Sequence, residues 1–199
     1  MFTRSLTTGK RRAVTATVAV SVCAAVALVV SLTSGNGQSG DRQYVGGGTS
    51  AWLYKPGHRP AAPAFSGTTL TGTPLKSSAY KGKAVVLNFW GSWCGPCRGE
   101  APTLAVLSEK YAKDGVSFLG DDVGDTPTNA LTFARGMGIT YPSLNDPGYQ
   151  IAQDFGTAVL INDTPTTLLL DPSGHIAGVI YGTATYGVLD EMLHDVVKA

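Results

Sequence analysis

The stretch "NFWGSWCGPCRGEAP", residues 88–102, holds two of the three cysteines in this 199-residue chain. An apolar run, "AVVLNFW" at residues 84–90, leads into it, which is typical of a central strand covered on both faces. Pro96 then begins a predicted helix over residues 96–113, at a position where the missing N–H group costs no hydrogen bond. Cys94 and Cys97 are therefore expected at a strand-to-helix junction, about one helical turn apart.

A cysteine pair with this spacing can bind a metal, crosslink the fold or exchange electrons. A zinc site needs four ligands, and the three histidines, His58, His175 and His194, show no ligand spacing, so no metal is predicted. A disulfide across so short a loop restricts the unfolded chain little. Electron exchange fits best, because a helix N-terminus favours a thiolate at Cys94, and Cys97, one turn into the helix, would be shielded and could act as the resolving thiol.

The residues from about 63 onward predict one α/β domain. Residues 65–70 and 73–76 flank Thr71-Gly72 and indicate an N-terminal β-hairpin. The remaining expected elements are strands at 115–122, 166–171 and 175–182 and helices at 126–135, 148–155 and 185–198. Strands that alternate with helices and end in a hairpin imply a mixed central sheet with helices on both faces.

The motif Trp-Cys-Gly-Pro-Cys after an apolar strand resembles the active site of thioredoxin-fold proteins. Residues 63–199 are most similar to the membrane-tethered TlpA/ResA-like family. An export segment, the hairpin before the motif, and an inserted helix and loop between residues 124 and 155 carry that resemblance. It implies a thioredoxin-like fold with an N-terminal β-hairpin and a central insertion, and thiol–disulfide exchange through Cys94 and Cys97 without a bound cofactor.

The resemblance also assigns a substrate-binding surface. In the family a cis-proline loop faces the active cysteines, and here Thr164-Pro165 matches it, just before the strand "TLLLD". A proline that merely starts the strand is the alternative, and sequence leaves its isomer open. Trp93, Gly95 and Pro96 around the cysteines are expected to complete this surface.

Glu100 is the third candidate catalytic residue. Many thioredoxins carry a buried Asp six residues before the first cysteine, where this chain has Asn88, which cannot act as a base. The family glutamate three residues after the second cysteine is matched by Glu100, about one helical turn from Cys97. The alternative is a solvated helix carboxylate. Asp121 and Asp122 are interpreted as strand-end carboxylates without a catalytic role.

Residues 1–34 are predicted to be a cytoplasmic basic stretch followed by a signal-anchor or transmembrane segment. Basic residues at 10–12 precede an uncharged, mostly apolar run over 13–32, about the length that spans a bilayer, and no Lys or Arg follows before Arg42. Thr33-Ser34-Gly35 leaves cleavage and secretion open. The Gly-, Ser- and Pro-rich residues 35–62 are predicted to be a flexible extracytoplasmic linker.

These patterns favour an extracytoplasmic thiol–disulfide oxidoreductase anchored to the cell membrane. By resemblance it is a reductant that acts on protein thiols and disulfides, with apocytochrome c as one substrate and a membrane electron donor. The alternatives are an exported oxidant, a peroxiredoxin-like antioxidant, whose Pro-x-x-x-Thr/Ser-x-x-Cys pattern is absent, and a non-catalytic binding module. Residues from Asp41 onward hold 11 basic and 14 acidic side chains, which argues against nucleic acid as a partner.

Overall fold

The computed structural model describes residues 41–46, 50–156 and 158–198. The predicted cytoplasmic and membrane segment and the first residues of the predicted linker lie outside these ranges. Within them, no helix is both long and apolar enough to cross a bilayer. The description below concerns the compact unit that begins at Gly40.

A seven-stranded mixed sheet organises this unit, in the order β1-β2-β9-β8-β5-β6-β7. Strands β5, β6 and β7 run parallel, whereas β8, β9, β2 and β1 pair antiparallel with their neighbours. The strands are β1 (Arg42–Val45), β2 (Ser50–Tyr54), β5 (Val85–Trp90), β6 (Ser117–Val123), β7 (Ser143–Asp146), β8 (Thr166–Leu170) and β9 (Ile176–Tyr181). Every residue of β5 is buried, as the unbroken apolar run predicts for a strand covered on both faces.

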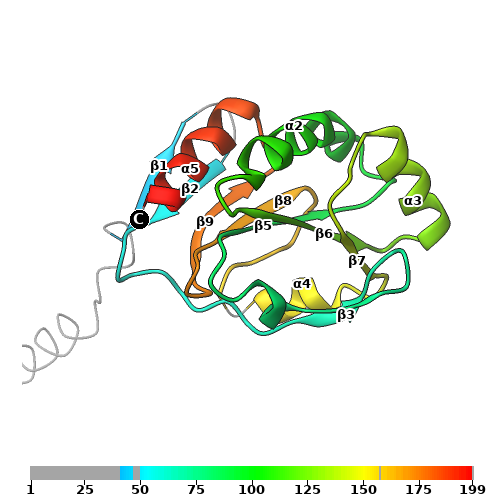
Figure 1. Ribbon diagram of the computed structural model, residues 1–199, viewed down its shortest axis with the longest axis horizontal. Helices are drawn as coiled ribbons and strands as arrows, with labels where there is room; N and C mark the ends of the chain where they lie inside the picture. Colours follow the sequence, from blue (N-terminus) through cyan, green and yellow to red (C-terminus); the bar gives the residue numbers. More distant parts are fainter. Residues whose placement is uncertain (1–40, 47–49, 157, 199) are drawn as a thin grey trace, which may run out of the picture. The chain divides into compact units, whose positions relative to one another are not determined.

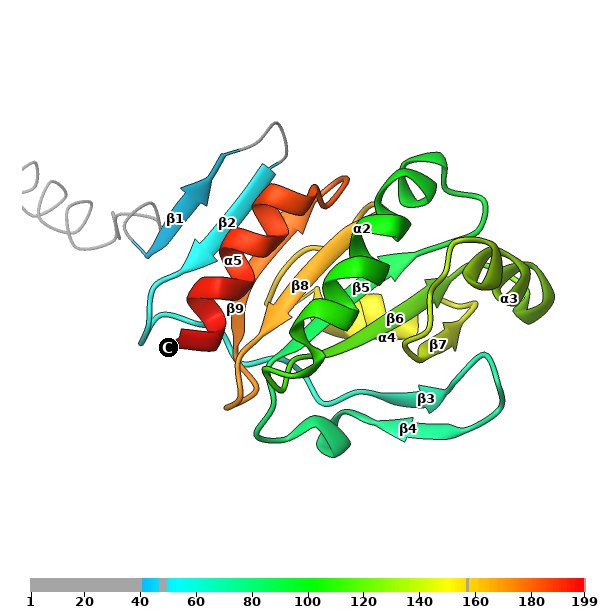
Figure 2. The same ribbon diagram turned by 45° about the horizontal axis from the view of Figure 1, so that its top comes forward.

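Helices cover both faces of the sheet (Figures 1 and 2). One face carries α2 (Gly95–Ala112), α3 (Pro127–Gly136) and α5 (Tyr186–Lys198), and the other carries α4 (Gln150–Phe155), the hairpin β3 (Ser66–Thr68) and β4 (Pro74–Lys76), and the 3₁₀-helix η1 (Ser77–Tyr80). The thioredoxin-like architecture, its N-terminal hairpin and its central insertion are thereby confirmed.

Alternation along β5 builds the two cores. Val86 packs on the side of α2 and α5, with Leu104 and Leu189. Leu87 and Phe89 point the other way, and the ring of Phe89 lies 5.8 Å from that of Phe155 in α4. This period of two fixes which side of the sheet each β5 side chain reaches, including Asn88 on the α2 side.

The prediction of a flexible linker is wrong for residues 42–45 and 50–54. They form β1 and β2, and β2 pairs with the edge of β9. Ala51 is fully buried and Leu53 is 9% exposed, while the Arg42 guanidinium lies 5.1 Å from the centre of the Trp52 ring. The two short strands could not be recognised among Gly- and Ser-rich neighbours. They form because the edge of β9 would otherwise leave its backbone N–H and C=O groups unpaired.

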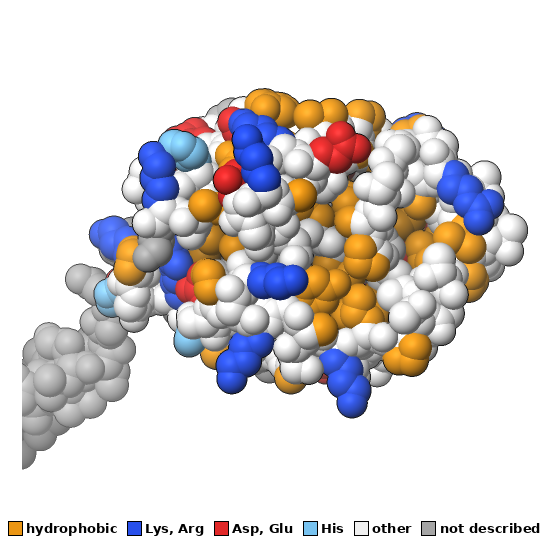
Figure 3. All heavy atoms as spheres, viewed as in Figure 1, with side chains coloured by type: hydrophobic (Ala, Val, Ile, Leu, Met, Phe, Trp, Pro, Cys, Tyr) orange, Lys and Arg blue, Asp and Glu red, His pale blue; other side chains and the backbone are white. Residues whose placement is uncertain are grey.

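On the face shown in Figure 3, hydrophobic side chains gather between the positions of α2 and α4, and charged side chains are spread around them.

Candidate active site

The disulfide lies where β5 passes into α2. Cys94 is the N-cap residue of α2, with extended backbone angles (φ −83°, ψ 112°), and its Sγ accepts a hydrogen bond from the Cys97 backbone N–H at 3.1 Å. The two sulfurs are bonded, and the Cα atoms are 5.3 Å apart. Pro96 stands in the first turn, where it removes no intrahelical donor. The geometry therefore directs helix N–H groups toward the Cys94 sulfur.

Both cysteines are buried, whereas the attacking thiol, Cys94, is expected from its place at the start of the helix to be exposed. Cys97 is 1% exposed, as a shielded resolving thiol should be, but Cys94 is only 4% exposed. The reason is a small hydrophobic cluster in which Trp90 and Phe133 pack with both cysteines. The neighbours Trp93, Gly95 and Pro96 are exposed and lie at the surface beside the disulfide.

The Thr164–Pro165 peptide bond is cis. Thr166 pairs with Phe89 across β8 and β5, so Pro165 falls beside the end of β5 that leads to Cys94. The Pro165 carbonyl accepts a hydrogen bond from the Gly182 N–H at 2.9 Å, which ties the loop to the end of β9. The structure thus brings the predicted proline loop and the disulfide to the same edge of the sheet.

Glu100 is buried inside the domain and is not a solvated carboxylate, since it is 1% exposed. Its Oε1 accepts a hydrogen bond from Asn88 Nδ2 at 2.8 Å, and its Oε2 accepts one from the Ala184 N–H at 2.6 Å. Burial raises the pKa of Glu100 to about 7, although these two hydrogen bonds favour the charged form. Asn88 also donates to Thr167 Oγ1 at 3.0 Å, so the amide that replaces the thioredoxin aspartate orients the glutamate.

Two carboxyl groups near the end of a strand, where the sequence places them, are buried inside the domain. Asp121 and Asp122 are fully buried near the end of β6, on opposite faces of the sheet. Burial, reinforced by the negative charge of neighbouring aspartates, raises the pKa of Asp121 to about 9 and that of Asp122 to about 7. Within the described residues, no N–H or O–H group donates a hydrogen bond to either carboxylate. The available signal was two acids inside an otherwise apolar strand.

Asp125 is a positioning residue that sequence reasoning missed. Its carboxylate accepts hydrogen bonds from the Ser92 N–H at 2.8 Å and the Thr126 N–H at 2.7 Å, which joins the loop before Cys94 to the start of α3. Partial burial favours the neutral acid, but these hydrogen bonds outweigh it and lower the pKa of Asp125. Among the described residues, no group of three or more His, Cys, Asp or Glu side chains could hold a metal.

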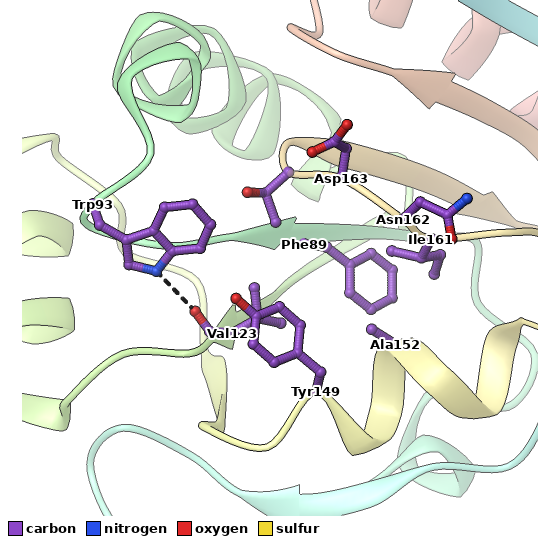
Figure 4. Close-up of a pocket in the computed structure, with 9 residues that line it drawn as sticks. Phe89, Trp93, Val123, Tyr149, Ala152, Ile161, Asn162 and Asp163 are labelled. Carbon is purple, nitrogen blue, oxygen red and sulfur yellow. Dashed lines mark hydrogen bonds between the residues drawn. The ribbon is translucent and has the colours of Figure 1, made fainter.

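A cavity of about 240 Å³ adjoins this surface, between the Trp93 loop, α4 and the loop that precedes Pro165 (Figure 4). Trp93 borders it on one side, where its indole Nε1 donates to the Val123 carbonyl at 3.1 Å. Tyr149 lies in front of Val123, and Phe89 and Ile161 lie farther from Trp93. Four segments of the chain therefore meet at one hollow, which is bordered by Trp93, the residue before Cys94.

A disulfide at a helix N-terminus, beside a cis-proline loop on a thioredoxin-like sheet, defines the class of thiol–disulfide oxidoreductases. The family model "AhpC/TSA family" matches residues 59–179, and the chain belongs to that family.

Curated relatives agree with this class. The chain is 39% identical to the thiol-disulfide oxidoreductase ResA of Geobacillus thermodenitrificans (strain NG80-2) over 124 residues, which are 62% of this chain and 69% of that protein. It is 33% identical to ResA of Bacillus subtilis (strain 168) over 134 residues, which are 67% of this chain and 70% of that protein.

Solved structures share the fold. A DsbF homologue from Corynebacterium diphtheriae superposes with a TM-score of 0.68 at 33% identity, covering 77% of this chain and 98% of that one. A secreted thiol-disulfide isomerase from Corynebacterium glutamicum superposes with a TM-score of 0.70 at 29% identity, covering 79% and 98%.

Proposed function

We propose that this oxidoreductase works outside the cytoplasm, as a reductant of disulfides in exported polypeptides. The observation that carries the proposal is the Cys94–Cys97 disulfide at the N-terminus of α2, with a helix N–H directed at Cys94 Sγ. Such an N–H group and the helix dipole stabilise a thiolate, which is the nucleophile in disulfide exchange.

The reaction runs in two displacements. The Cys94 thiolate attacks one sulfur of a substrate disulfide, a mixed disulfide forms, and the other substrate sulfur leaves as a thiolate. The Cys97 thiolate then attacks Cys94 Sγ, the Cys94–Cys97 bond forms, and the second substrate thiolate leaves. Two electrons pass to the substrate, and the buried position of Cys97 keeps the resolving thiol away from other disulfides.

Glu100 is proposed as the base for the second displacement. A thiol that is 1% exposed resists ionisation because burial disfavours charge. Glu100 follows Cys97 by one turn of α2, and its raised pKa, about 7, suits proton transfer near neutral pH. The hydrogen bond from Asn88 holds the carboxylate in place but cannot replace it as a base.

The reduction potential decides the direction of electron flow. The Gly-Pro dipeptide between the cysteines resembles reductants, so we expect a value near that of thioredoxin, about −270 mV. A value near −120 mV would instead support an oxidant. The oxidant is the second candidate function, because an oxidising compartment outside the cytoplasm would favour it. Equilibration of the Cys94–Cys97 pair with glutathione of known potential measures the difference.

The remaining alternatives have direct tests. The AhpC/TSA family description raises peroxidase activity, but Pro-x-x-x-Thr/Ser-x-x-Cys is absent, so we expect no consumption of peroxide by the reduced protein. A non-catalytic binding module would keep its function after Cys94→Ser. We expect that substitution to abolish function.

The proposed location rests on the basic cluster and apolar run in residues 10–32, which favour an anchor with residues 35–199 outside. Apocytochrome c and a membrane electron donor are the proposed partners. Expression of Cys97→Ala in the native host should trap substrates as mixed disulfides with Cys94, and mass spectrometry would identify them. Protease added to wall-stripped cells should remove the domain, whereas full protection would reverse the proposed topology.

A further inference from the structure

The cavity beside Trp93 borders the surface over which a substrate must approach. Trp93 immediately precedes Cys94, and Thr164 immediately precedes Pro165, and both line the cavity (Figure 4). Because Cys94 is only 4% exposed, a substrate sulfur reaches it only if the residues around the substrate cysteine lie against these borders. The occupant of the cavity is therefore a part of the polypeptide close to the reacting cysteine.

The inner lining of the cavity is apolar, whereas the exposed Asn162 and Asp163 and the half-buried Thr164 add polar groups at its border. Phe89, Val123 and Ala152 are buried and contribute carbon atoms to its inner surface. At its rim, Trp93 is 56% and Tyr149 40% exposed, although large aromatic side chains normally bury most of their surface. Uncovered apolar surface around a hollow marks a binding site for an apolar group.

Tyr149 stands in a fixed and unusual position. Its φ of +57° lies in the left-handed region, which aromatic residues rarely adopt. The Asp146 carbonyl accepts hydrogen bonds from the N–H groups of both Tyr149 and Gly124, at 3.2 and 3.3 Å. The phenol lies directly against Gly124, where an added Cβ would be 2.6 Å from the Tyr149 Oη. The ring is thus held as one wall of the cavity by the turn around Asp146 and by the open space at Gly124.

We propose that this cavity is the subsite for an apolar side chain within two residues of the reacting cysteine of a polypeptide substrate, and that Tyr149 limits its size. The proposal rests on the function proposed above and adds a substrate preference to it. The oxidoreductase then selects its substrates by the sequence around the cysteine as well as by the disulfide itself.

The test compares two peptides that differ only in the residue after their single cysteine, Leu in one and Ser in the other. Each is supplied as a mixed disulfide with thionitrobenzoate, whose release by the reduced full chain is followed by colour. A small disulfide, 2-hydroxyethyl disulfide, measures the rate of disulfide exchange with a substrate that has no side chain to occupy the subsite. The variants are Ala152→Leu, which fills the cavity, and Tyr149→Asn, which removes the wall but tolerates the left-handed conformation. Tyr44→Asn, at an exposed tyrosine on β1, is the matched control.

We expect the wild type and Tyr44→Asn to react with the Leu peptide about tenfold faster than with the Ser peptide. In Ala152→Leu and Tyr149→Asn the two peptide rates should agree within about twofold, once each is divided by the rate of the same variant with 2-hydroxyethyl disulfide. Equal peptide rates in the wild type, or a preference that survives in both variants, would overturn the subsite and leave the proposed function standing. A wild type that reduces none of the three disulfides would overturn the proposed function.

Discussion

Replacing Glu100 by Gln should change how the stability of the protein depends on pH. The folded state raises the pKa of this carboxyl from 4.5 to about 7, because burial disfavours the charged form. Between these two values the folded protein binds more protons than the unfolded chain, so the free energy of unfolding falls as pH rises through this window. The Glu100→Gln variant has no group that ionises at this position, so its free energy of unfolding should not show this decrease.

The size of the effect follows from the pKa. A difference of one in pKa corresponds to about 1.4 kcal/mol, so ionised Glu100 costs the folded protein about 3 kcal/mol at pH 8 and above. Because Glu100 is only 1% exposed, screening by solvent reduces this free-energy cost very little. The new amide can still accept the hydrogen bond from Ala184 N–H, and the Asn88 amide can turn to accept one from it, so the variant should fold.

Urea unfolding of the oxidised protein at pH 5 and pH 8 measures this difference. From pH 5 to pH 8 the wild type should lose about 2–3 kcal/mol more stability than Glu100→Gln. Glu109→Gln, at an exposed carboxylate of the same helix, should stay within about 0.5 kcal/mol of the wild type at both pH values. Parallel pH profiles for the wild type and Glu100→Gln would show that the buried carboxyl does not titrate as argued.

The same variant tests the proposed chemistry. Stopped-flow oxidation of the reduced protein by a model disulfide, followed by Trp fluorescence, should show resolution slowed by at most about 10²–10⁴. In the wild type the rate should rise as pH increases through 7, and Glu100→Gln should lose that rise. An unchanged rate and pH profile, with Cys97 still shielded from alkylation, would leave Glu100 with a structural role only.

Three further predictions concern other residues. Asp121→Asn should stabilise the protein by up to about 4 kcal/mol at pH 7. The folded state raises the pKa of Asp121 from 3.8 to about 9, so the free energy of unfolding of the wild type falls as pH rises between these values. A urea midpoint no higher than that of the wild type would contradict this prediction. Asp171→Ala should lower the free energy of unfolding, measured by thermal unfolding, by about 3 kcal/mol, because it leaves the largely buried Arg59 without its 3.0 Å ion pair. A loss below about 1 kcal/mol would show that this ion pair contributes little to stability. In the reduced protein, alkylation followed by mass spectrometry should modify Cys94 much faster than Cys97, and the reverse order would exchange their assigned roles.

Local patterns explain how much of the fold was predictable. The apolar run of β5, the proline that starts α2 and the turn between β3 and β4 each act within a few neighbouring residues, so their sequence signals are strong. Strands β1 and β2 escaped prediction because their pairing depends on the free edge of β9, more than 120 residues further along the chain. Pairing with a distant strand gives a short, Gly-rich segment almost no recognisable sequence pattern.

The same distinction holds for the site. The cysteine pair, Glu100 and the proline loop are recognisable because their residue types and spacing are fixed by chemistry. The burial of Asp121 depends on the packing of β7 and α4 around it, and the cavity depends on the meeting of four segments. The left-handed conformation of Tyr149 could not be anticipated, because nothing in the residue type favours it.

The first strand also determines where the described chain enters the domain. β1 starts at Arg42, opposite Tyr54, and the chain of pairings through β2, β9 and β8 places this point level with the first residues of β5. The disulfide lies past the other end of β5. The described chain therefore enters the domain at the pole away from its reactive sulfurs. The exposed residues around the disulfide, Trp93, Gly95 and Pro96, lie at the opposite pole, so the chain that leads into β1 leaves this surface open to a polypeptide substrate.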